Sequence, residues 1–185
     1  MTRVPPHEAA ARRDAALERL AERVPFVRFL GVKFERRGDE LTGRMAFDPK
    51  LIGNPAIPAL HGGATGAFLE ITAQVALAWS VLRDRLDTDP EAAAAIEAGT
   101  FPPMPKTIDF TVDYLRAGQP RDAYARATVA RAGRRYASVR VEAWQDERAR
   151  PFAAATGHFL MPAQAAGRAE DLSPDSAPPA PDRRG

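Results

Sequence analysis

The sequence predicts an α+β fold in which a curved antiparallel sheet wraps around one long buried helix. Residues 64–82 contain no Pro and are apolar on nearly every face, which is typical of a helix surrounded by protein on all sides. Two segments before this helix and four after it have the alternation and turn residues of antiparallel strands. A sheet that curves around the helix would leave it without a polar face.

The 185 residues are enough for one domain with a substantial core. We expect an N-terminal helical extension over 1–24, a single domain over 25–162, and a disordered tail over 163–185. Residues 7–23 have strong helix propensity, and Pro25 ends that helix. The tail is dominated by Pro, Ala, Asp, Ser and Arg, which cannot bury enough apolar surface to fold.

Within the domain, residues 26–31 predict a short amphipathic turn, and 83–99 an inserted helix for which Gly99 is a plausible C-cap. The strands are expected, in chain order, at 32–37, 40–47, 106–114, 123–131, 136–144 and 152–161.

Residues 106–114 show the clearest strand alternation in the chain. Strict alternation places Ile108 on one face with the other apolar residues of the strand. Thr107 is then expected on the opposite face, together with the acidic residues.

Composition excludes several kinds of site and partner. The chain has no Cys, which excludes disulfides, thiolate metal sites and cysteine nucleophiles. We expect no metal, because His7, His61 and His158 are scattered without ligand spacing. The net charge is only +2 and no basic run alternates with aromatic residues, so we expect no nucleic-acid partner. No signal-like or membrane-spanning stretch stands out, so we expect no membrane partner and a cytoplasmic protein.

One stretch carries the candidate chemistry. A Pro-punctuated loop from Asn54 leads to His61-Gly62-Gly63, and Glu70 follows inside the long helix. The first N–H groups of a helix lack internal partners and carry the positive end of its dipole, and glycines let a ligand oxygen approach them. Such donors suit a polarised carbonyl or a developing oxyanion. A buried carboxylate such as Glu70 is costly unless it is paired or used.

The spacing of His61 and Glu70 is informative in itself. Nine residues are roughly two and a half helical turns, so the two side chains should point to opposite faces about 13 Å apart along the axis. One substrate could hardly touch both within a single chain. If both are catalytic, a second subunit must supply one of them.

A set of motifs carries a resemblance to a known family: Phe29-Leu30-Gly31, Gly53-Asn54-Pro55, His61-Gly62-Gly63, Glu70, residues 107–116 and residues 153–157. With these motifs the chain resembles the hotdog-fold acyl-CoA thioesterases, in particular the PaaI-like (phenylacetic acid degradation) group related to 4-hydroxybenzoyl-CoA thioesterase. The resemblance covers roughly residues 25–161 and implies the hotdog fold and hydrolysis of an acyl-CoA to free acid and CoA.

The resemblance also implies a homodimer or homotetramer with active sites at the subunit interface, and no cofactor beyond the CoA of the substrate. By position, Gly62 and Gly63 would form the oxyanion hole and His61 would orient the thioester or the loop. Glu70 of the partner subunit would activate water or attack the thioester directly. A loop-fixing or capping role explains His61 equally well, and a paired structural carboxylate is the alternative for Glu70.

Five further residues are candidate substrate-binding residues. Asn54 stands one place before a position where the family often has Asn or Gln, and Gln74 where Thr or Ser often follows the acid. Phe68 would help to set the depth of the acyl pocket. Arg134 and Arg135 would bind CoA phosphates, although a solvated turn explains them as well.

Two other functions stay open on the same fold. A non-catalytic acyl-CoA-binding module would keep the pocket without turnover. A hydroxyacyl-thioester dehydratase would need a His in the loop before the helix, where this sequence has Ala56 and its neighbours.

Overall fold

The computed structural model describes residues 6–162, so the expected disordered tail lies outside the described residues. The elements in chain order are α1 (Pro6–Glu22), α2 (Pro25–Leu30), β1 (Val32–Arg37), β2 (Glu40–Met45), η1 (Pro49–Leu51), β3 (Ile52–Asn54), β4 (Ala59–Leu60), α3 (Gly62–Thr88), α4 (Pro90–Glu97), β5 (Lys106–Tyr114), β6 (Ala123–Ala132), β7 (Tyr136–Trp144) and β8 (Ala153–Leu160).

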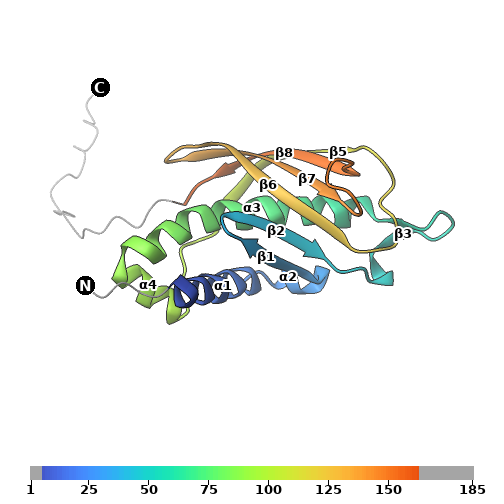
Figure 1. The fold of residues 1–185 in the computed structure, drawn as a ribbon. Coiled ribbons are helices and arrows are strands. Elements are labelled where there is room, and N and C mark those ends of the chain that lie inside the picture. Colours follow the sequence, from blue (N-terminus) through green and yellow to red (C-terminus); the bar gives the residue numbers. More distant parts are fainter. Residues whose placement is uncertain (1–5, 163–185) are drawn as a thin grey trace, which may run out of the picture.

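Six strands form one sheet in the order β1-β2-β6-β7-β8-β5, and every neighbouring pair is antiparallel. β3 and β4 form a separate two-stranded hairpin. The sheet bends around α3, which contacts β2, β5, β6, β7 and β8 (Figure 1). The α+β fold expected from the sequence, a curved antiparallel sheet around one long buried helix, is confirmed.

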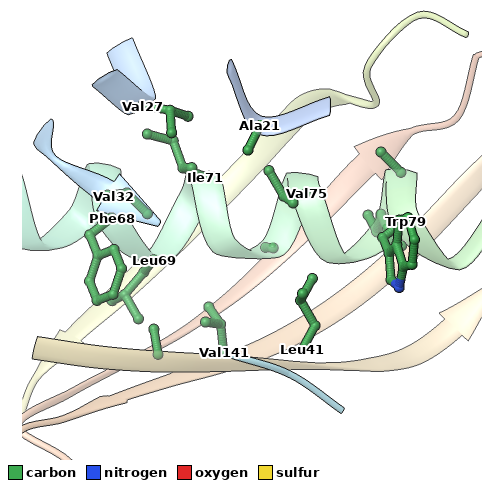
Figure 2. Close-up of a cluster of buried hydrophobic side chains, with 14 of the residues drawn as sticks. Ala21, Val27, Val32, Leu41, Phe68, Leu69, Ile71, Val75, Trp79 and Val141 are labelled. Atoms are coloured by element: carbon green, nitrogen blue, oxygen red, sulfur yellow. The ribbon is translucent and has the colours of Figure 1, made fainter. Parts of the chain in front are cut away.

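α3 is the axis of the core, and at 27 residues it is longer than the expected 64–82. Phe68, Leu69 and Val75 have no exposed surface, and Figure 2 shows them among the side chains that fill the space between α3 and its neighbours. The helix is long and apolar enough to cross a membrane, but 61% of its most apolar window is buried inside the fold. Its apolar residues therefore serve the protein core.

The expected inserted helix over 83–99 divides into two parts. Its first residues continue α3 to Thr88, and α4 then begins after Asp89. The Asp89 carboxylate accepts hydrogen bonds from the N–H groups of Glu91 and Ala92, 3.1 and 3.0 Å away. Gly99 follows α4 with a φ of 88°, a left-handed conformation that glycine adopts without strain.

The N-terminal helix α1 packs on the domain and shares its core. Leu17 and Leu20 are 2% and 1% exposed. At its edge Asp14 pairs with Arg36 of β1 at 2.8 Å. The residues after α1, expected as a turn, form the short helix α2 with Pro25 at its start, where the missing N–H costs nothing.

β5 contains a β-bulge that overturns the expected alternation. Thr107 pairs with Phe159 of β8 and Asp109 with His158, so Ile108 is an extra residue without a partner. The bulge turns Thr107 toward α3 and leaves Ile108 54% exposed. The expectation that Thr107 faces away from the helix was wrong, because strict alternation cannot foresee a bulge. β5 also lies at one end of the sheet order, with β8 as its only neighbouring strand among the described residues.

Candidate functional site

His61 caps the start of α3. Its φ and ψ of −62° and 131° lie outside the helical region, and its Nδ1 accepts a hydrogen bond from the Gly63 N–H at 2.9 Å. A ring nitrogen that accepts a hydrogen bond carries no proton, so a neutral His61 ring has its proton on Nε2. The His61 carbonyl oxygen accepts from the Thr65 N–H at 3.0 Å. The His61 ring therefore satisfies one orphan donor of the helix, the Gly63 N–H, and its carbonyl accepts the first intrahelical hydrogen bond, so the Gly63 amide is occupied in this arrangement.

The Gly62 amide is an open donor at the helix start. Within residues 6–162 the Gly62 N–H has no hydrogen-bond partner, while its carbonyl oxygen accepts from the Tyr114 hydroxyl at 2.8 Å. A Cβ at position 62 would lie 3.4 Å from the Tyr114 ring, an ordinary contact. An unpaired N–H at the positive end of a 27-residue helix can polarise a carbonyl oxygen placed beside it.

The loop before α3 is built to hold His61. A Cβ at Gly53 would lie 2.8 Å from the His61 Cα, so only glycine permits this approach. The Asn54 Oδ1 accepts from the Ala56 N–H at 3.0 Å and so closes the turn. The oxygen of Asn54, a candidate substrate-binding residue, is thus used inside the loop.

Glu70 lies half-buried on α3 and faces β5. The Thr107 Oγ1 donates to the Glu70 Oε1 at 2.6 Å, and the Gln74 Nε2 donates to the Thr107 Oγ1 at 3.0 Å. The structure therefore joins two of the sequence-predicted residues through a third that sequence analysis missed. Glu70 is half-buried and so less buried than expected, and its other oxygen, Oε2, has no hydrogen-bond partner within residues 6–162.

Gly62 and Glu70 both face β5 but lie at different heights along it. Gly62 is level with Tyr114, and Glu70 is level with Thr107 at the other end of the strand. Eight residues of helix separate them by about 12 Å along the axis. A thioester carbonyl held by the Gly62 N–H of one chain is therefore out of reach of the Glu70 carboxylate of the same chain.

The other candidate residues lie apart from this pair. Phe68 is fully buried and packs toward β2, so within this chain its ring offers no surface to a substrate. Arg134 and Arg135 are exposed between β6 and β7, and neither forms an ion pair with a described residue. No group of three His, Asp or Glu side chains within residues 6–162 could hold a metal ion.

A polar surface cleft lies between the loops 115–122 and 145–151. Arg116 donates to the carbonyl oxygen of Pro151 at 2.9 Å, and Arg121 pairs with Asp146 at 2.8 Å. Since these guanidinium groups already bind partners in the two loops, their evident role is to join the loops.

Comparison with known proteins decides the family. The model of the acyl-CoA thioesterase N-terminal domain matches residues 53–160. The medium/long-chain acyl-CoA thioesterase YigI of Escherichia coli K12 is 33% identical over 140 residues, which cover 75% of this chain and 86% of YigI. The YigI of Salmonella typhimurium is 31% identical with the same coverage.

The chain belongs to the acyl-CoA thioesterase family. The enzyme hydrolyses acyl-CoA thioesters, as the resemblance implied. A Shewanella oneidensis protein related to the thioesterase superfamily is 27% identical, covers 83% of this chain and 97% of its own, and superimposes with a TM-score of 0.65. A Bacillus halodurans protein solved with CoA shares the fold at 16% identity and a TM-score of 0.55, over 86% of this chain and 95% of its own.

Proposed function

We propose that this thioesterase acts on medium- or long-chain acyl-CoA, as the name of its YigI relative suggests, at a site shared between two subunits. The Gly62 amide of one subunit polarises the thioester carbonyl, and Glu70 of the other supplies the carboxylate. The separation of the open Gly62 amide from Glu70, about 12 Å along one helix, carries this proposal.

The free edge of β5 supports a two-fold dimer. Beside the edge the side chains of Ile108, Tyr114 and Leu115 are 54%, 57% and 52% exposed, an apolar surface that a partner would cover. Two copies of β5 that pair antiparallel about a two-fold axis run in opposite directions. The Thr107 end of one copy then meets the Tyr114 end of the other, and each Glu70 approaches the Gly62 amide of the other subunit.

The chemistry follows from these two groups. As a general base, the Glu70 carboxylate takes a proton from water while the water oxygen bonds to the carbonyl carbon. The Gly62 N–H stabilises the oxyanion that forms, and its collapse breaks the C–S bond and expels the CoA sulfur, which receives the proton. As a nucleophile, the Glu70 carboxylate would instead attack the carbonyl carbon and expel CoA as its thiolate, which leaves an anhydride with the acyl group that water then hydrolyses. Both routes end in the free acid and CoA.

Two exposed arginines, the absence of a further cofactor and the assembly of the chains complete the proposed function. Arg134 and Arg135, exposed beside the end of β5 that carries Lys106, would attract the CoA phosphates. The reaction needs no cofactor beyond the CoA of the substrate. We also propose a homodimer, alone or paired into a homotetramer, that works in the cytoplasm.

The test is free-thiol release from acyl-CoAs of increasing chain length, with wild type, Glu70→Gln and the control Glu35→Gln. Glu35 is exposed on β1, so its amide variant should keep wild-type activity. We expect Glu70→Gln to lower kcat by about 10² or more. Wild-type rates from Glu70→Gln would remove Glu70 from the mechanism. Tight binding without thiol release by wild type would instead favour the non-catalytic binding module.

A further inference from the structure

The bulge in β5 turns Thr107 toward α3, whereas in a regular strand Thr107 would face away from this helix. Thr111, on the same strand, follows the ordinary pairing opposite Thr156 and is exposed on the outer face of the sheet. Thr107 lies beyond the bulge at Ile108, is half-buried, and points to α3. β-bulges often re-aim a single side chain beside an active site.

The hydrogen bonds around Thr107 have a fixed direction. The Gln74 Nε2 can only donate, so the Thr107 Oγ1 accepts that bond, 3.0 Å long. The hydroxyl has one proton, and it goes to the Glu70 Oε1 at 2.6 Å. Glu70 is thus held through one oxygen, which leaves Oε2 to face water or the thioester.

We propose that Thr107 is a positioning residue for Glu70, and that Gln74 sets the direction in which the Thr107 hydroxyl points. The inference rests on the proposed function of Glu70 and adds how its carboxylate is aimed. A Glu side chain has three rotatable bonds, whereas Thr is β-branched and stiff at χ1 and stands on a paired strand. A short hydrogen bond from the stiff residue fixes the flexible one, and a misplacement of about 1 Å can cost about 10² in rate.

Gln74 positions Glu70 indirectly, because it orients the Thr107 hydroxyl. It lies four residues after Glu70, so both side chains leave the same face of α3 and reach Thr107 from neighbouring turns. The sequence-based expectation that Gln74 binds substrate therefore gains an alternative, in which Gln74 acts only through Thr107.

The test compares Thr107→Val, which keeps the shape of the side chain without its hydroxyl, with Thr107→Ser, which keeps the hydroxyl. Thr111→Val is the matched control on the other face of the strand. We expect Thr107→Val to lower kcat about 10- to 100-fold with KM changed by less than about threefold, and Thr107→Ser to keep most of the rate. Thr111→Val should match wild type, and thermal unfolding and light scattering should find all three variants folded in the wild-type assembly.

A double variant separates positioning from a merely structural role. If Thr107 acts through Glu70, Thr107→Val should lower the residual rate of Glu70→Gln by less than about twofold. Equal loss from Thr107→Val in both backgrounds, or a Thr107→Ser as slow as Thr107→Val, would overturn the positioning role. If Glu70→Gln is impaired while Thr107→Val keeps wild-type kcat, the Thr107 inference alone fails. If Glu70→Gln equals wild type, the proposed function fails and the inference with it.

Discussion

A substitution can remove the Gly62 N–H while helix α3 still forms. Gly62 is the first helical residue of α3. Pro is common at this position because the N–H group that it lacks would have no intrahelical partner there. His61 has φ −62° and ψ 131°, an extended conformation that suits a residue before Pro. Gly62→Pro should therefore fold and lack one atom that matters, the amide hydrogen. Gly62→Ala is the matched control, since it adds the same Cβ, 3.4 Å from Tyr114, and keeps the N–H.

The expected loss follows from what one oxyanion donor contributes. Removal of such a donor costs about 10²–10³ in kcat, or about 2.7–4 kcal/mol of transition-state stabilisation. Stability should not fall, because Pro at a compatible position restricts the unfolded chain. The assay is steady-state thiol release from one acyl-CoA, with the melting temperature measured on the same samples.

The two variants separate the Gly62 N–H from the added Cβ. Gly62→Ala should keep wild-type kcat to within about threefold, because its donor is intact. A folded Gly62→Pro as fast as Gly62→Ala would show that the Gly62 N–H holds no oxyanion, and equal loss in both variants would assign the effect to the added Cβ.

Three further predictions concern the cap, an ion pair and a close packing contact. His61→Ala should lose about 1 kcal/mol of unfolding free energy in urea, whereas His61→Asn, which also caps helices, should keep stability and most of the activity. A stable but inactive His61→Asn would give His61 a catalytic role. The Phe47 N–H and the Arg44 guanidinium hold the pKa of Asp122 below its ordinary value. The ionised Asp122 carboxylate therefore stabilises the folded protein above its unfolded pKa of about 4, and this stabilisation is lost as pH falls through the folded pKa. Asp122→Asn should cost about 1–2 kcal/mol at pH 7, nearer the lower value because the carboxylate is 33% exposed, and the difference from wild type should vanish in urea titrations at low pH. Gly157→Ala should cost about 1–3 kcal/mol in urea, because its Cβ would lie 2.5 Å from the Phe110 ring, and an unchanged midpoint would contradict that contact.

Much of the fold could be predicted because it depends on local patterns. An apolar run without Pro predicts a buried helix wherever it lies, and its extension to Thr88 was missed because residues 83–88 are polar apart from Leu86. α2 was missed because its six residues, Pro25–Leu30, are too few for a helical period to stand out.

The candidate site was predictable only in part. The order His61-Gly62-Gly63 indicates a helix start with open donors, yet which amide the ring would occupy depends on a side-chain rotamer. Thr107 was missed for a different reason, since a bulge inserts one residue without a sequence signal and reverses the face of every residue beyond it. Whether two copies of β5 pair depends on two chains. The spacing of His61 and Glu70 in one chain can indicate only that a second chain is needed.

The shared site is tested most directly with mixed dimers. Gly62→Pro and Glu70→Gln each disable both sites of a homodimer if every site takes Gly62 from one subunit and Glu70 from the other. A mixed dimer, isolated by two affinity tags, then has one intact site and one doubly defective site. If each site is shared between subunits, two nearly inactive proteins give a mixed dimer with about half the wild-type rate of thiol release. A mixed dimer as inactive as its parents would contradict a site shared between subunits.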